Sequence, residues 1–332
     1  MSKIFDKNAH GVSQLISSPN MWAYDMWKTA LANHWVPHSI DMTDDIAQWK
    51  NGALTEDEML LVKRTLGLFA SGESMVSNSV AMVEFQYITD GSCRQYLLKK
   101  QFEESLHNST VEVCCSSFNL DIKEVAEAYK SIPSIKLKNK FLNKSLDSFD
   151  SDFDISSNEG KRKFLRNLAV YYLVCEGTWF FSNFALILSL GRQGKLSGLC
   201  DQIKYTLRDE SLHVEFGANV INRAKEDYPQ IWTKGFEKEI VSLIQEGVEL
   251  ELRYAKEILP NGILGVNYEL LEKYIKFLAN LRLQSIGVGS IFPEKSNPFP
   301  WLAEAQDTSS MSAFFERRET SYQSTSSLED DF

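Results

Sequence analysis

Apolar residues recur at spacings of three and four along most of the chain, which is the pattern of helices with one buried face. No stretch alternates apolar and polar residues in the way of a half-buried strand. The sequence therefore predicts an all-α protein. The predicted helices cover residues 18–33, 43–49, 55–87, 91–118, 122–131, 136–148, 160–191, 199–224, 230–258 and 267–286.

The stretch 160–191 is apolar nearly all round, which predicts a central, buried helix. Glu176 interrupts it, with apolar residues for two turns on either side. A buried carboxylate is costly without a partner. The nearest basic residues, Arg166 and Arg192, lie far along the same helix. We therefore expect Glu176 to serve a site rather than a structural ion pair.

The motif Glu-x-x-His occurs twice, at Glu104–His107 and at Glu210–His213. Residues three apart share one face of a helix, so this carboxylate and imidazole can bind the same metal centre. One such motif on a surface helix is weak evidence, but both copies stand in long helical patterns with apolar flanks. They predict two related halves of one site.

A further glutamate precedes each motif within a helical pattern. Glu73 follows Phe69 by four positions, which places it on or beside an apolar face, and Glu176 precedes the second motif. One Glu from each of two helices and Glu-x-x-His from each of two others is the ligand set of dimetal carboxylate bundles. We therefore expect a ferritin-like helical bundle with a dimetal carboxylate site in its four-helix core. The expected ligands are Glu73, Glu104, His107, Glu176, Glu210 and His213.

Composition limits the remaining choices. The net charge of −10 argues against non-specific binding of nucleic acid. The five cysteines are odd in number and form no C-x-x-C motif, which argues against a disulfide framework. The N-terminus has no apolar signal region, and polar residues break the apolar stretches before spanning length. We expect a soluble, cytoplasmic protein without a membrane partner.

Three parts are expected along the 332 residues. Residues 1–17 form an irregular N-terminal arm, 18–289 the helical domain, and 290–332 a flexible tail. The tail is rich in proline at first and then in serine, threonine and charge, and we expect its last stretch, residues 322–332, to be disordered when free. Within the domain, Glu246, Glu249 and Glu251 predict a partly solvent-facing helix over 230–258.

Carboxylates and imidazoles suit iron or manganese and oxygen chemistry, whereas a structural zinc site would use thiolates. The alternative is a buried polar network without metal. From about Trp22 to the C-terminus the chain resembles the small, radical-generating subunit of class I ribonucleotide reductase. The resemblance rests on Glu73, on Phe102–His107, on Glu176, on Arg208–His213, and on Trp35 followed by Pro37.

The resemblance implies the role of each ligand. Glu73 and His107 would bind the first metal, Glu176 and His213 the second, with Glu104 and Glu210 bridging them.

The resemblance also implies a radical pathway. Trp35, Asp209 and His107 would form a hydrogen-bonded chain from the metals toward the surface, although Trp35 could also be a core aromatic. Tyr322 would pass the radical to a large catalytic subunit, on which residues 328–332 of the tail would dock. The family also implies a homodimer.

The sequence departs from the commonest family pattern near the site. Val111 stands four residues after His107, where the radical tyrosine usually lies, and the first ligand, often Asp, is Glu73. Both departures resemble the tyrosine-less class Ic subgroup, which uses a manganese–iron pair. Tyr205 matches a tyrosine that assists electron delivery there, or is a helix-packing residue. We expect Mn/Fe, with Fe/Fe and Mn/Mn as alternatives. A related oxidase family has Val at the same position.

Three functions follow from these patterns. The first is the small subunit of ribonucleoside-diphosphate reductase, activated by O2 and active only with its large subunit. The second is a stand-alone Mn/Fe or di-iron ligand-binding oxidase, and the third is a non-catalytic iron-storage bundle. The tail favours the first, because a docking peptide with a redox tyrosine has no use in the other two.

Overall fold

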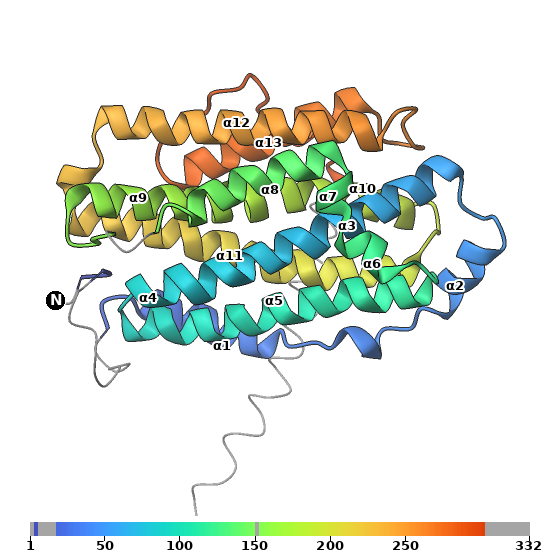
Figure 1. Cartoon of the computed structure of the whole chain (residues 1–332), viewed down its shortest axis with the longest axis horizontal. Helices are drawn as coiled ribbons and strands as arrows, with labels where there is room; N and C mark the ends of the chain where they lie inside the picture. Colours follow the sequence, from blue (N-terminus) through green and yellow to red (C-terminus); the bar gives the residue numbers. More distant parts are fainter. Residues whose placement is uncertain (1–2, 6–17, 150–152, 303–332) are drawn as a thin grey trace, which may run out of the picture.

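The computed structural model describes residues 3–5, 18–149 and 153–302. These residues form helices, with a single antiparallel bridge between Ile263 and Val266 in place of any strand. Long helices run side by side along the molecule (Figure 1). The predicted all-α class is confirmed.

The helices follow the predicted segments closely. In chain order they are α1 Met21–Ala32, α2 Thr43–Lys50, α3 Glu56–Ser79, α4 Phe85–Tyr87, α5 Gly91–Ser117, α6 Ile122–Ala126, α7 Ala128–Ser131, α8 Pro133–Leu146, α9 Asn158–Leu168, α10 Phe181–Gly191, α11 Ser197–Asp227, α12 Lys234–Ile258 and α13 Tyr268–Ser285. Two short 3-10 helices are η1 Pro37–Ser39 and η4 Pro229–Ile231, and two π-helical segments are η2 Val80–Glu84 and η3 Ala169–Phe180.

Side-chain caps fix where the site-bearing helices begin. Thr55 and Glu58 form the predicted capping box at the start of α3, each accepting a hydrogen bond from the other's backbone N–H. The buried carboxylate of Asp45 on α2 caps α11, accepting the backbone N–H groups of Gly198 at 2.9 Å and Leu199 at 2.7 Å. A residue distant in sequence therefore sets the start of α11.

The π-helical segment η3 is the centre of the bundle, and all of its residues are buried. It packs against α9, α11, α12 and α13. The continuous helical stretch Asn158–Gly191, of which η3 is the middle, is apolar and long enough to cross a membrane, but its apolar window is wholly buried inside the protein. That burial is what a core helix of a soluble protein shows.

Glycines let the neighbouring helices approach η3 closely. A Cβ at Gly217 of α11 would lie 2.2 Å from the ring of Tyr172, and one at Gly247 of α12 would lie 2.4 Å from Val174. No side chain fits at such distances. The spacing of the core helices therefore depends on the absence of a Cβ at these positions.

A buried ion pair, remote from the predicted ligands in sequence, joins α8 to α12. Lys138 contacts Glu251, and its ammonium lies 4.6 Å from the ring centre of Trp179 and 4.2 Å from that of Tyr254. Asn183 donates to the same carboxylate at 3.1 Å. The prediction that Glu251 faces solvent is wrong, since it is 1% exposed, whereas Glu246 and Glu249 are exposed as expected.

The predicted arm and tail lie mostly outside the described residues. Of residues 1–17 the structure describes 3–5, in which Ile4 and Phe5 are buried against the bundle. The ring of Phe5 meets that of Phe164 edge-on, with centroids 4.9 Å apart. Tyr322 and residues 328–332 are not among the described residues, so their roles stay predictions.

Candidate metal centre

The six predicted ligands come from four core elements. Glu73 lies on α3, the first Glu-x-x-His motif on α5, Glu176 on η3, and the second motif on α11. Each of these side chains is at most 2% exposed. The structure therefore gathers all six residues inside the bundle, as the repeated motif predicted.

The first group surrounds His107. Its Nδ1 atom lies 3.4 Å from Glu73 Oε2, 3.1 Å from Glu210 Oε1 and 3.9 Å from Glu104 Oε2. One donor atom from each of these four residues fits within a sphere suited to a single metal ion. Residues of both Glu-x-x-His motifs therefore contribute to this group.

The second group surrounds His213. Its Nδ1 atom lies 3.3 Å from Glu210 Oε2 and 3.3 Å from Glu104 Oε1. Donor atoms of Glu176, Glu210 and His213 lie close enough together to share a metal ion. Glu210 belongs to both groups, and the two imidazole rings are 5.8 Å apart.

The donor set fits a pair of transition-metal ions. Several of its buried atoms make no hydrogen bond, although buried polar groups normally do. They are Glu73 Oε2, Glu104 Oε2, Glu176 Oε2, both Glu210 oxygens and the Nδ1 atoms of His107 and His213. These atoms converge, and carboxylate oxygen with imidazole nitrogen is the donor combination that iron and manganese take.

Electrostatics point to the same conclusion. Burial raises the pKa of Glu73 and of Glu176 well above the ordinary carboxyl value. Burial alone would lower the pKa of His213, but the Glu210 carboxylate raises it to about 10. Burial likewise acts against ionised Glu210, yet His213 and His107 hold the pKa of that carboxyl well below its usual range. The cluster strongly attracts positive charge.

A buried lysine corrects the prediction for Glu176. Lys100 of α5 lies 2.9 Å from Glu176 Oε1 and 2.6 Å from Glu104 Oε1, with all three side chains fully buried. Burial opposes its charge, but the two carboxylates raise the pKa of Lys100 well above its ordinary value. The expectation of no basic partner is wrong because the partner comes from another helix. The one available signal was the i, i+4 spacing of Lys100 and Glu104.

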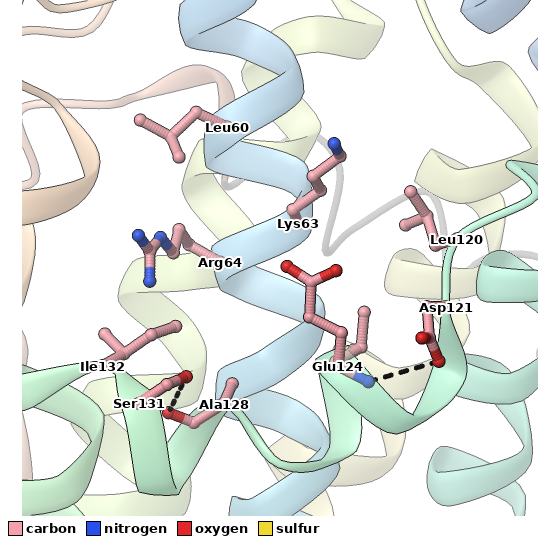
Figure 2. A pocket seen from close by; sticks show the side chains of 10 residues that line it. Leu60, Lys63, Arg64, Leu120, Asp121, Glu124, Ala128, Ser131 and Ile132 are labelled. Carbon is pink, nitrogen blue, oxygen red and sulfur yellow. Dashed lines mark hydrogen bonds between the residues drawn. The ribbon is translucent and has the colours of Figure 1, made fainter.

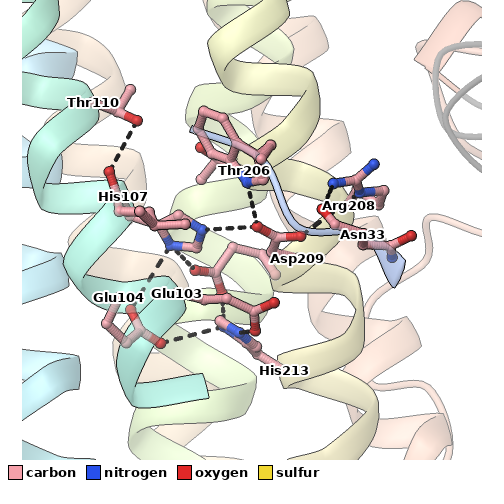
Figure 3. A network of polar contacts seen from close by, with 12 residues as sticks. Asn33, Glu103, Glu104, His107, Thr110, Thr206, Arg208, Asp209 and His213 are labelled. Carbon is pink, nitrogen blue, oxygen red and sulfur yellow. Dashed lines mark hydrogen bonds and ion pairs between the residues drawn. The ribbon is translucent and has the colours of Figure 1, made fainter. Parts of the chain in front are cut away.

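Each histidine also contacts a carboxylate through its second ring nitrogen (Figure 3). His107 Nε2 lies 3.5 Å from Asp209 Oδ2, and His213 Nε2 lies 3.0 Å from Glu103 Oε2. Such contacts orient a ligating imidazole. Sequence reasoning missed Glu103, although it precedes Glu104 just as Asp209 precedes Glu210.

Trp35 approaches this centre from the segment between α1 and η1. Its indole N–H donates to Asp209 Oδ2 at 2.7 Å, and its ring stacks on Tyr205 with centroids 5.3 Å apart. The Arg208 guanidinium lies 5.0 Å from the centre of the Tyr205 ring. The chain Trp35–Asp209–His107 therefore exists as a line of contacts, and Trp35 itself is 8% exposed.

Two further features concern the surroundings of the centre: a valine near His107 on α5, and a pocket that lies elsewhere. Val111 is buried on α5, one turn beyond His107, so a side chain without a hydroxyl stands beside the cluster. A pocket of about 400 Å³ lies between α3 and α6–α7, with Lys63, Arg64 and Glu124 among its lining residues (Figure 2). None of the candidate ligands lines that pocket.

Comparison with known proteins covers nearly the whole chain. The family described as ribonucleotide reductase, small chain, matches residues 13–298. The ribonucleoside-diphosphate reductase subunit beta of Chlamydia pneumoniae is 40% identical, over 97% of this chain and 93% of its own. The R2 subunit of ribonucleotide reductase from Clostridium botulinum superimposes with a TM-score of 0.85 at 27% identity, covering 92% of this chain and 94% of that one.

An R2-like ligand-binding oxidase also superimposes, with a TM-score of 0.68, 18% identity, and coverage of 84% of this chain and 99% of that one. At this identity it shows the shared fold alone. The predicted ferritin-like bundle and the reductase hypothesis are confirmed, ahead of the oxidase and the storage bundle. The chain belongs to the ribonucleotide reductase small chain family, and so functions as an oxidoreductase subunit of ribonucleoside-diphosphate reductase.

Proposed function

We propose that this small chain uses a mixed Mn/Fe pair in the manner of the tyrosine-less class Ic subgroup. The observation that carries the proposal is Val111, because a valine beside the cluster has no phenol to hold a radical. Glu73 as first ligand, in place of the more common Asp, supports it. When bound and activated by O2, the metal pair supplies the one-electron oxidising equivalent that the reductase needs.

The chain's own residues hold and shield that pair. Glu73 and His107 would hold the first ion and Glu176 and His213 the second, with Glu104 and Glu210 supplying carboxylate oxygens to both. Asp209 and Glu103 fix the rings of the two histidines through their Nε2 atoms. The apolar core around η3 excludes water.

The oxidising equivalent leaves the bundle through Trp35. An electron moves inward from the indole ring toward His107, while the indole proton stays shared between Nε1 and Asp209 Oδ2. Tyr205, stacked on Trp35, delivers electrons while the centre is being activated. Outward transfer continues through Tyr322 of the tail to a cysteine of the large subunit.

The remaining parts of the proposal concern assembly. The large subunit binds residues 328–332 of the tail, with Leu328 and Phe332 as apolar anchors. Two copies of the small chain form a homodimer, and the complex works in the cytoplasm. The helical domain, residues 18–289, carries the metal chemistry, and the tail, residues 290–332, carries the docking.

The deciding experiment is metal analysis combined with electron paramagnetic resonance on protein that has been loaded anaerobically and then exposed to O2. Protein given Mn and Fe together should reach full reductase activity with its large subunit and show no tyrosyl-radical signal. Protein given iron alone should be much less active. A strong tyrosyl signal, or full activity with iron alone, would contradict the class Ic assignment.

A further inference from the structure

The two groups of candidate ligands differ in their relation to positive charge. The first group offers four donors, Glu73, Glu104, His107 and Glu210, whereas the second offers Glu176, Glu210 and His213. In the described part of the chain, neither Glu73 nor Glu210 forms an ion pair with a lysine or arginine. Glu176 of the second group does, as does Glu104 of the first, and in both cases the cation is Lys100. The asymmetry is therefore one of ligand number and of charge.

Lys100 takes the oxygens that face the second group. It bonds Oε1 of Glu176 and Oε1 of Glu104, and the latter atom also lies 3.3 Å from His213 Nδ1. Oε2 of both glutamates makes no hydrogen bond, and Glu104 Oε2 points toward His107. A metal ion that enters beside His213 must therefore compete with an ammonium group for the same carboxylates.

The ammonium cannot move away from the cluster at low cost. Lys100 is fully buried, and Tyr172 covers it with its ring centre 4.9 Å from Nζ. The next carboxylate that acts on Lys100 electrostatically is Glu84, which already accepts hydrogen bonds from Tyr172 and Ser79. A buried charge without a partner is strongly unfavourable. Moving the ammonium group away from Glu104 and Glu176 would therefore take it from its two closest partners in the core.

Resting on the proposed dimetal function, we infer that Lys100 makes the two metal sites unequal, so that the site around His107 fills before the site around His213. The lysine weakens the second site by charge repulsion and by occupying Glu176 Oε1, an atom of a ligand that belongs to that group alone. In the first group it contacts only Glu104, through Oε1, and leaves the Oε2 atom that points toward His107 without a hydrogen bond. Ordered filling has a use in a mixed-metal protein, because two different ions can then enter according to their availability. Lys100 is a positioning residue, since it contacts the ligands and not the substrate.

Anaerobic titration of the full chain with Mn(II) alone tests this inference, because the free ion gives a paramagnetic resonance signal that disappears on binding. The wild-type chain should bind one ion tightly and a second about tenfold or more weakly. Lys100→Gln, which removes the charge, should bind the first ion as the wild type does and the second several-fold more tightly. The control Lys138→Gln removes another fully buried lysine, whose partner Glu251 is no candidate ligand, and should keep the wild-type gap.

The possible results distinguish failure of the inference about Lys100 from failure of the proposed metal centre. Equal affinities in the wild type, or an unchanged gap in folded Lys100→Gln, would overturn the role of Lys100 and leave the metal centre standing. Absence of any bound Mn(II) in the wild type would remove the metal centre and this inference together. Equal affinities in the wild-type titration would overturn the inference even where a variant loses its helical circular-dichroism signal.

Discussion

Trp35 and Asp209 are 174 positions apart in sequence, yet the indole N–H of one donates to the carboxylate of the other at 2.7 Å inside the protein. The same oxygen, Oδ2, also faces His107 Nε2 at 3.5 Å. One carboxylate thus links an aromatic ring near the surface to a histidine of the candidate metal centre. Among the described tryptophans, Trp35 is the one joined to the cluster by such contacts.

The first prediction is that Trp35→Phe abolishes ribonucleotide reduction and leaves the metal centre intact. Phenylalanine keeps the ring stacked on Tyr205 but can neither donate to Asp209 nor be oxidised as readily as indole. Reductase assays with the large subunit should fall to background, while metal content and oxygen uptake match the wild type. Trp49, which stacks on Phe118 away from the cluster, offers the control: Trp49→Phe should remain active. Normal turnover by Trp35→Phe would contradict the proposed electron-transfer pathway through Trp35.

Periodicity was sufficient for the helices because the long segments bury an apolar face, and several of them, including α3, α5, α12 and α13, also have a side-chain cap at the start. Thr55 with Glu58 is a local signal of this kind, and it specified the start of α3 correctly. The π-helical turns of η3 were not predictable. The segment is apolar on all sides, so its hydrophobic pattern has no periodicity that would reveal a change in the number of residues per turn. Asp45 capping α11 was also hidden, because the contact is long-range.

The second prediction concerns the ligands themselves. Glu176→Ala or His213→Ala should lower the metal content by about one ion per chain, because each removes a donor from the three-residue group. Inductively coupled plasma analysis measures it directly. Glu84→Ala is the matched control, since Glu84 is equally buried but bonds Tyr172 and lies outside both groups. Full occupancy of both sites in the ligand variants would show that the assignment is wrong.

The candidate site was predictable where the spacing of nearby residues in the sequence reveals it. Two Glu-x-x-His motifs and two isolated glutamates sufficed to nominate six residues that the fold brings together. Lys100 was missed because a lysine four residues before Glu104 looks the same on a surface helix, and its contact with Glu176 depends on how α5 packs near η3. Which charged side chains pair in the core depends on how the helices pack, and local spacing in the sequence does not show this.

The third prediction tests packing. Gly217→Ala should destabilise the protein by about 1–3 kcal/mol, because the added Cβ would overlap the Tyr172 ring and push α11 away from η3. The unfolding midpoint in urea, or the melting temperature, reports the change. Gly235→Ala is the control, since a Cβ there meets only Thr233 Oγ1 at 3.7 Å. If Gly217→Ala melted like the wild type, the close approach of α11 and η3 would not be required.

The last prediction concerns the tail, whose role rests on the sequence. Truncation after Glu319 should abolish ribonucleotide reduction and leave metal binding and oxygen uptake unchanged, because the ligands all lie on α3, α5, η3 and α11. The stretch 320–332 is acidic and polar in composition, and we predict that it binds a groove of the large subunit.

Tyr322→Phe separates the tail's two roles, since it keeps the ring and removes only the oxidisable hydroxyl. That variant should bind the large subunit with wild-type affinity and show background turnover, whereas the truncated chain should fail in both assays. Leu328→Ala is the converse control, because it removes an apolar anchor and should weaken binding while saturating large subunit restores activity. Undiminished reduction by the truncated chain would leave residues 320–332 without a part in catalysis and send the search for the exit route back to the surface around Trp35.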